Sequence, residues 1–205
     1  MTCDAVREQG RRCIAIPADL SDPSAVETFF STIFAEFGRV DVLVNNAGIT
    51  EPEPPTDTSV EKWDRMIRVN LSSVYYCCHA VLDHMIERSA GSIVNISSVC
   101  GKNGGLKAGV HYSAAKAGVN GLTKGLADHV AQYGIRVNAV APAMIDTEMI
   151  RWRPAEVMRR TIARIPVGRL GTVDEVAAVV WYLSGTCSSF VTGTVVDING
   201  GLYMD

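Results

Sequence analysis

Residues 40–48 have the sequence VDVLVNNAG, and this stretch sets the fold class. Its first five residues form an apolar run interrupted only by Asp41, which is typical of a short strand buried on both faces. Strands of this kind belong to parallel sheets that helices cover on both sides. We therefore expect residues 40–44 to be a buried strand, with helices before and after it in the chain.

Strand and helix patterns alternate on both sides of this stretch. Further strands are expected at residues 13–18, 92–97, 135–141 and 194–198. Helices are expected at residues 23–37, 58–88, 110–133 and 172–183. Such alternation predicts an α/β fold, in which right-handed crossovers join the strands of a parallel sheet.

Three of the expected helices have clear N-terminal signals. Asp22 can cap a helix that has Pro23 as its first residue and Gly38 beyond its end. Two other helices begin with the spacing of a capping box, Thr58-x-x-Glu61 and Thr172-x-x-Glu175. These signals place the starts of the helices from local sequence alone.

The segment between the last two expected strands departs from the alternation. Residues 143–172 are rich in Met and Arg and are broken by Pro154 and Pro166. We expect this segment to be a lid over the carboxyl ends of the strands, where ligands bind in open parallel sheets. The chain is expected to be one domain, residues 1–205, that includes this lid.

The composition excludes several classes of protein. The 205 residues are 47% hydrophobic and 20% charged, with a net charge of −3, which suits one globular domain and gives no basic surface for nucleic acid. No apolar run reaches the roughly 18 residues that a membrane-spanning helix needs, and residues 1–4 do not resemble a signal peptide. We therefore expect a cytoplasmic protein that binds neither membrane nor nucleic acid.

The six cysteines show no spacing typical of a disulfide framework. Reduced thiols in a cytosolic protein are the better interpretation. Cys77-Cys78-His79 lies near His84, but adjacent cysteines point about 100° apart on a helix, and no CxxC accompanies them. Packing, and no metal site, is the prediction for this cluster.

Tyr112 and Lys116 are four residues apart in an expected helix, with Ser98 a short loop upstream. This spacing puts the phenol and the ammonium group on one face, about one turn apart. A nearby cation favours phenolate, so Lys116 is expected to lower the pKa of Tyr112 toward the range of a general acid and base. With a serine hydroxyl to hold a carbonyl oxygen, the three groups suit the interconversion of a carbonyl and an alcohol.

The surrounding motifs resemble those of the short-chain dehydrogenase/reductase family over residues 19–201. Six motifs occur in the family order: Asn45-Asn46-Ala47-Gly48, Val69-Asn70-Leu71, Ile96-Ser97-Ser98, Tyr112–Lys116, Ala141-Pro142-Ala143 with Thr147, and Asn199-Gly200-Gly201. Ser98-x-x-Gly101 also fits the family pattern. The resemblance implies a Rossmann-like, doubly wound parallel sheet.

The same resemblance implies four catalytic residues. Tyr112 would exchange a proton with the substrate oxygen, and Ser98 would position the carbonyl. Lys116 would assist Tyr112 and bind the nicotinamide ribose, while Asn70 would hold a water that links Lys116 to solvent. The implied cofactor is NADP or NAD, with NADPH slightly favoured, and its other contacts would come from Asp19, Leu20, Asn46, Ala47, Gly48, Ile145 and Thr147.

One part of the family pattern is missing. The chain contains no GxxxGxG, the Gly-rich turn that holds a pyrophosphate at a helix N-terminus. Its first expected strand corresponds to the third of the family, so the fold is expected to be N-terminally truncated, without the first two strands and that turn. Residues 13–18 would then have no neighbouring strand, and one sheet edge would be open.

Within the family, the nearest resemblance is to the 3-oxoacyl-[acyl-carrier-protein] reductases. The alternatives are a polyol, sugar or other alcohol dehydrogenase of the same family, or, in another class, a catalytically inactive chain with a structural or assembly role. An acyl-thioester or other small-molecule substrate is expected, and acyl carrier protein is a candidate partner for the arginines of the lid, Arg151, Arg153, Arg159, Arg160 and Arg164. A homo-oligomer, a dimer or a tetramer formed through the long helices at 59–88 and 110–133, is also expected.

Overall fold

A computed structural model describes residues 2–105, 108–151 and 154–204 of the chain. Four parallel strands form its sheet in the order β1-β2-β3-β4. They are β1 (Val42–Asn45), β2 (Gly91–Ile96), β3 (Ile135–Pro142) and β4 (Val195–Ile198). The fold is therefore α/β and Rossmann-like.

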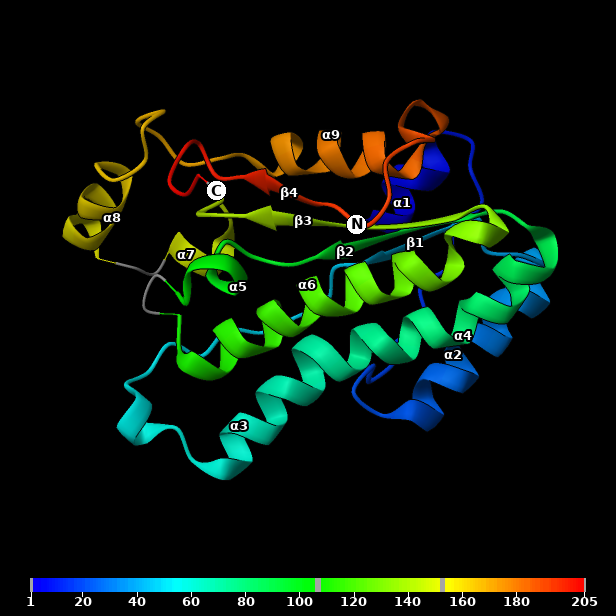
Figure 1. The fold of residues 1–205 in the computed structure, drawn as a ribbon, viewed down its shortest axis with the longest axis horizontal. Helices are drawn as coiled ribbons and strands as arrows, with labels where there is room; N and C mark the ends of the chain where they lie inside the picture. Colours follow the sequence, from blue (N-terminus) through cyan, green and yellow to red (C-terminus); the bar gives the residue numbers. More distant parts are fainter. Residues whose placement is uncertain (1, 106–107, 152–153, 205) are drawn as a thin grey trace.

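Helices cover both faces of the sheet, as Figure 1 shows. On one face lie α2 (Pro23–Phe37), α4 (Ser73–Arg88) and α6 (Val110–Val130), and on the other lies α9 (Val173–Ser184). The π-helical turn Arg68–Ser72 joins α3 (Val60–Ile67) to α4, so the two form one long rod. The remaining helices are short: α1 (Thr2–Glu8), α5 (Cys100–Asn103), α7 (Glu148–Arg151) and α8 (Ala155–Ile162).

Alternation along the central strands divides the core into two layers. Successive residues of a strand point to opposite faces, so Ile93 and Val94 of β2 enter different clusters. Ile93 packs with α2 and α4 residues such as Phe30 and Met85, whereas Val94 packs with Leu183 of α9. Burying these side chains on both faces holds the sheet between the two helical layers.

Local caps lie at the expected starts of two helices. The carboxylate of Asp22 accepts a hydrogen bond from the Ser24 amide, and the chain leaves α2 at Gly38. The capping box between Thr172 and Glu175 is present in both directions. These observations confirm the expected starts of α2 and α9.

The expected cap at Thr58 is wrong by one residue. Ser59 caps α3 by accepting a hydrogen bond from the Lys62 amide. Thr58 instead ends the 3₁₀ turn Pro55–Asp57, where its hydroxyl donates to the Pro54 carbonyl oxygen at 3.4 Å. Because that turn engages Thr58, the capping role passes to the next residue.

The expected strand at residues 13–18 is also wrong. The segment has no strand geometry and pairs with none of the four strands in the described residues. Since a strand exists only through its hydrogen-bonded neighbour, its apolar pattern alone does not make it one. β1 is consequently an edge strand with Val42 and Val44 40% and 41% exposed, instead of the fully buried strand that its apolar run predicted.

Candidate active site

A cavity of about 540 Å³ lies at the carboxyl ends of the strands. Asn46 lines it just after β1, Ser98 just after β2, and the segment after β3 supplies Ile145 and Thr147. Tyr112 enters the cavity wall from α6. Parallel strands end at the same edge of a sheet, which is why residues 100 positions apart in the chain meet here.

Ser98 and Tyr112 are in direct contact in this cavity. Burial raises the pKa of Tyr112 to about 12, and a hydrogen bond with Ser98 acts in the opposite direction. The Ser98 hydroxyl also accepts a hydrogen bond from the Cys100 amide at 3.2 Å, which holds its side chain in place. The two hydroxyls therefore form one polar pair in a mainly apolar wall.

Lys116 does not lower the pKa of Tyr112 in this structure, contrary to the expectation from their spacing. Its Nζ lies 5.8 Å from the centre of the Tyr112 ring and donates a hydrogen bond of 2.8 Å to the Ile96 carbonyl oxygen. Burial lowers the pKa of Lys116 itself to about 8. Burial of each side chain decides its pKa, and the i, i+4 spacing brings no opposing attraction between the two.

The shifted pKa of Lys116 predicts a stability that increases with pH. Folded Lys116 loses its proton near pH 8, whereas the unfolded residue keeps it to about pH 10.5, so the unfolded state binds more protons between these values. The free energy of unfolding should rise by about 2 kcal/mol from pH 7 to pH 9.5, and Lys116→Met should remove this rise. Urea unfolding at both pH values measures it.

Lys124→Met provides the matched control, because Lys124 is an exposed lysine on the same helix. This variant should keep the rise. Equal pH profiles for the unmodified chain and Lys116→Met would contradict the assignment of a depressed pKa to Lys116.

Asn70 lies in the π-helical turn, a geometry often found at functional sites. Its Oδ1 accepts from the Ile49 amide at 3.1 Å, and its Nδ2 donates to the Met66 carbonyl oxygen at 3.1 Å. A Cβ placed on Gly48 would lie 2.7 Å from that Oδ1 and 3.7 Å from the Lys116 Nζ. Gly48, Asn70 and Lys116 thus meet at one point, and only glycine leaves the space beside them open.

Only some of the residues expected to bind the cofactor line the cavity that holds Ser98 and Tyr112. Asn46, Ile145 and Thr147 line the same cavity as Ser98 and Tyr112, which suits the nicotinamide end of a dinucleotide. Six of the expected site residues do not line this cavity. Four of them are expected cofactor contacts, Asp19, Leu20, Ala47 and Gly48, and two are expected catalytic residues, Asn70 and Lys116.

The two residues expected at the adenine have other partners in the described structure. The Asp19 carboxylate accepts hydrogen bonds from the Ser21 amide and hydroxyl at 2.9 and 2.7 Å, and these bonds lower its pKa. Leu20 packs against the core beside α2 and α4. Ala47 is exposed directly after β1.

Sequence reasoning missed two contributions to the site. The Ile96 carbonyl, which holds Lys116, is a backbone group and gives no signal in side-chain patterns. The apolar face of α9 closes one wall of the cavity through Val173, Val176 and Val180. The helical spacing of these valines was visible in the sequence and indicates a buried face, though not which cavity it lines.

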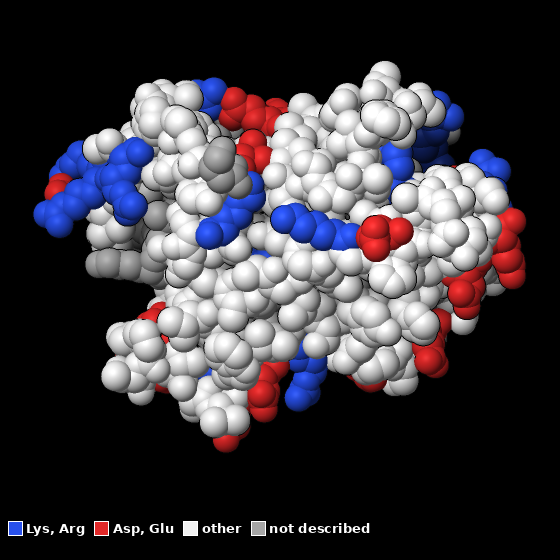
Figure 2. Space-filling view, viewed as in Figure 1, with Lys and Arg blue, Asp and Glu red and all other residues white. Residues whose placement is uncertain are grey.

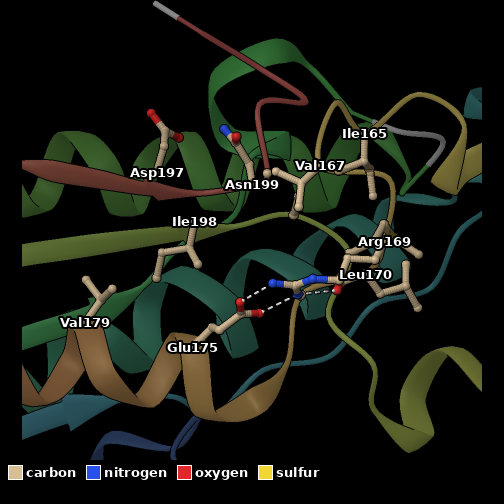
Figure 3. Close-up of a pocket in the computed structure, with 13 residues that line it drawn as sticks. Ile165, Val167, Arg169, Leu170, Glu175, Val179, Asp197, Ile198 and Asn199 are labelled. Carbon is tan, nitrogen blue, oxygen red and sulfur yellow. Dashed lines mark hydrogen bonds and ion pairs between the residues drawn. The ribbon is translucent and has the colours of Figure 1, made fainter.

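A smaller cavity of about 320 Å³ adjoins the first across Ala143 and Met144, and Figure 3 shows its lining. Arg169 pairs with Glu175 through two contacts, of 3.0 and 2.6 Å. Glu175 also accepts from the Thr172 amide, and these partners lower its pKa to about 2. The pair joins the segment before α9 to the first turn of that helix.

The described part of the chain shows neither a cluster of metal ligands nor a membrane-spanning helix. Its His, Cys, Asp and Glu side chains form no group of three or more suited to a metal ion. None of its helices has the length and apolar character required to cross a membrane.

Comparison with known proteins identifies relatives over nearly the whole chain. A family model described as enoyl-(acyl carrier protein) reductase matches residues 1–203. The 3-oxoacyl-[acyl-carrier-protein] reductase of Escherichia coli is 42% identical over 188 residues, which are 91% of this chain and 76% of the relative. The cis-4-hydroxycyclohexanecarboxylate dehydrogenase of Sinomonas cyclohexanicum is 41% identical over 198 residues, 96% of this chain and 79% of the relative.

A solved structure has the same fold. The crystal structure of the 3-oxoacyl-[acyl-carrier protein] reductase of Brucella melitensis superimposes with a TM-score of 0.92 at 38% identity. The match covers 100% of this chain and 77% of that one. The acetoacetyl-CoA reductase of Rhizobium meliloti is 44% identical over 90% of this chain and 77% of the relative.

Proposed function

Because the chain belongs to the short-chain dehydrogenase/reductase family, we propose that it is an NAD(P)-dependent oxidoreductase that interconverts a carbonyl and a secondary alcohol. The proposed substrate class is that of a 3-oxoacyl-[acyl-carrier-protein] reductase. The observation that carries the proposal is the contact between Ser98 and Tyr112 in the cavity wall, with Lys116 and Asn70 behind it.

Each of these residues has a chemical role in the proposed reaction. Ser98 holds the carbonyl oxygen by donating a hydrogen bond to it, and Tyr112 delivers the phenolic proton to the same oxygen during reduction. In the oxidation direction, the Tyr112 phenolate accepts that proton. The nicotinamide supplies or receives the hydride when it is bound. Lys116 would hydrogen-bond the nicotinamide ribose, and Asn70 would hold a water through which Lys116 exchanges protons with solvent.

The residues near the cavity suit the nicotinamide end of the cofactor. Asn46, Ile145 and Thr147 would contact this end from the cavity wall, and the open space at Gly48 admits a close approach to Lys116. Ala47, Asp19 and Leu20 would contact the adenosine part. The resemblance to 3-oxoacyl reductases favours NADPH over NADH.

The choice of substrate follows from the kinds of relatives. Reductases of 3-oxoacyl and acetoacetyl thioesters are 42% and 44% identical to the chain, which supports a 3-oxoacyl thioester. A second candidate is a cyclic secondary alcohol, because the hydroxycyclohexanecarboxylate dehydrogenase matches 96% of the chain. The apolar wall that α9 contributes suits either an acyl chain or a carbon ring.

A cofactor titration tests the proposal directly. The 205-residue chain is titrated with NADPH and NADH while nicotinamide fluorescence is followed, and saturable micromolar binding is the expected result. Gly48→Val should abolish binding because its side chain fills the space beside Asn70 and Lys116, whereas Gly121→Ala, in open space on α6, should not. The absence of binding at millimolar cofactor would favour a structural or assembly role instead. Turnover of acetoacetyl thioesters against cyclic alcohols then separates the two substrates.

We also propose that acyl carrier protein presents the substrate, through the arginines of the lid. Arg159 and Arg160 on α8 have side chains 73% and 79% exposed, and Figure 2 shows basic side chains gathered over this helix. Arg164 is exposed just beyond it, while Arg153 and the side chain of Arg151 lie outside the described part of the chain. An acidic carrier would be attracted to this surface.

Replacing Arg159 and Arg160 by glutamine should lower kcat/KM for an acyl-carrier thioester by about tenfold at low salt, because steering of the acidic partner is lost. The rate with the corresponding coenzyme A thioester should change much less. Arg39→Gln, at an exposed arginine paired with Asp41, is the control. An equal loss for both thioesters would place the effect in the active site and contradict docking at α8.

We further propose that the chain forms a homo-oligomer and is a cytoplasmic enzyme. A homodimer or homotetramer would pair through α4 and α6, where Tyr75 and Val110 are 45% and 44% exposed. Sedimentation of the purified chain measures this state, and a monomer at working concentration would refute it. Reduced cysteines suit a cytoplasmic enzyme.

A further inference from the structure

Two cysteine side chains meet where α1 and the segment that follows it lie against each other. The Sγ of Cys13 donates a hydrogen bond to the Sγ of Cys3 at 3.0 Å. Both residues are partly buried, and both are free thiols. Neither lines the cavity that holds Ser98 and Tyr112.

The chain itself holds the two thiols together. α1 ends in a turn at Gly10, where a φ of 71° reverses the chain direction. The amides of Gly10 and Arg11 donate back to the carbonyl oxygens of Arg7 and Val6, at 2.8 and 3.3 Å. The Arg7 side chain then donates to the Cys13 carbonyl oxygen at 2.8 Å. The contact of the sulfurs is therefore built by the fold of residues 2–13.

We propose that Cys3 and Cys13 are a reversible redox pair that small disulfide compounds oxidise to an intramolecular disulfide. A disulfide bond is about 2.0 Å long, so the sulfurs must approach by about 1 Å from their separation of 3.0 Å. The bond ties α1 to the segment that leads to Asp19.

The oxidation is an exchange of two thiols with one disulfide. One cysteine thiolate attacks a sulfur of glutathione disulfide, forms a mixed disulfide and releases the first glutathione thiolate. The second cysteine thiolate then attacks the protein sulfur of that mixed disulfide and releases the second glutathione. Two protein thiols are oxidised, one glutathione disulfide is reduced to two glutathiones, and the two thiol protons pass to solvent or to the leaving thiolates.

A basic groove beside Cys13 gives such an oxidant access. It has a volume of about 440 Å³ and is lined by Arg7, Arg11, Arg12, Cys13 and Glu36, among others. Three guanidinium groups lie on its wall against one carboxylate, which pairs with Arg12 at 2.5 Å. The excess of positive charge attracts an anionic disulfide such as glutathione disulfide.

The other cysteines are poorer targets. Cys77, Cys78 and Cys100 are buried. Burial raises the pKa of Cys77 to about 11 and that of Cys78 to about 12, which keeps both as unreactive thiols. Cys187 is exposed, but within the described residues no hydrogen bond joins it to a second cysteine. The pKa of Cys13 is also raised, chiefly by its hydrogen bond with Cys3. It is therefore the contact between two partly exposed thiols, and not a lowered pKa, that directs oxidation to Cys3 and Cys13.

Peptide mapping after incubation with glutathione disulfide tests the proposal on the whole 205-residue chain. Trypsin cleaves after Arg7, Arg11 and Arg12, so Cys3 and Cys13 fall on separate peptides, residues 1–7 and 13–39. The expected product joins these two peptides with the loss of two hydrogen atoms, and dithiothreitol separates them. Cys187→Ser should give the same product, and Cys13→Ser should not.

Repeating the oxidation in urea separates the effect of the fold from closeness in sequence. The ratio of linked peptides to glutathione adducts should be at least about tenfold higher for the folded chain, because the fold raises the effective concentration of one thiol at the other. Separate stable adducts on Cys3 and Cys13, links between two copies of residues 1–7, or an equal ratio in urea would each overturn the proposal. None of these outcomes depends on the dehydrogenase activity.

Discussion

Replacing Tyr112 by phenylalanine should lower kcat for reduction of an acetoacetyl thioester by about 10²–10⁴-fold, the usual contribution of a general acid. The phenol is the group in contact with Ser98 in the cavity wall, and phenylalanine keeps the ring while removing the proton that it transfers. Steady-state rates with saturating NADPH measure the effect, and nicotinamide fluorescence should show nearly unchanged cofactor binding.

A conservative control separates chemistry from folding. Tyr75→Phe makes the same change at a tyrosine that is 45% exposed on α4, and its rate should stay within about twofold of the unmodified chain. Tyr112→Phe should also lower the free energy of unfolding by no more than about 1.5 kcal/mol, because phenylalanine keeps the buried ring and removes only the hydrogen bond with Ser98. A rate above a tenth of the original would mean that another group donates the proton.

The second large effect is on stability. Gly101→Ala should reduce the free energy of unfolding by about 3 kcal/mol, at the upper end for overpacking. A Cβ at this position would lie 2.6 Å from the Lys116 carbonyl carbon and 2.8 Å from the Ala117 amide nitrogen. Both are backbone atoms in the middle of α6, so α5 must move away from α6. Urea unfolding measures the loss.

Gly121→Ala on α6 is the matched control, because no atom lies within 4 Å of the new methyl group. This variant should gain about 0.5–1 kcal/mol, as alanine is the better helix former. Gly101→Ala should also lower the rate while folded, since α5 begins two residues after Ser98 and its displacement moves that hydroxyl from Tyr112. An unchanged urea midpoint would show that the two helices do not pack this closely in solution.

Local signals were enough to predict the starts of two long helices and the shared helix face of Tyr112 and Lys116. The Asp22 cap and the capping box of Thr172 and Glu175 involve residues within three positions of each other, so the sequence contains all the information that they need. The spacing of Tyr112 and Lys116 likewise puts both on one helix face without reference to the rest of the chain. The family resemblance then predicted Ser98, which the structure brings to Tyr112.

Expectations that depended on distant partners were the ones that changed. Residues 13–18 have a strand-like pattern, but they form no strand, because no strand of the described chain pairs with them. The open sheet edge was expected, and it leaves β1 partly exposed instead of buried on both faces. The cap at Thr58 moved to Ser59 because a neighbouring turn engages the threonine hydroxyl. The strand thus failed for want of a distant partner, whereas the cap moved because of a local turn that the sequence analysis did not recognise.

The sequence by itself determined the α/β class and the starts of α2 and α9, because these follow from periodicity and from contacts within a turn of helix. The expected catalytic residues came from the family resemblance of the motifs. Only the tertiary structure decided the number of paired strands, the pKa values of Tyr112 and Lys116, and the separation of Asp19 from the cavity. It alone showed the contact between Cys3 and Cys13. The physical reason is that strand pairing and desolvation depend on which segments pack together in space, and no local pattern contains that information.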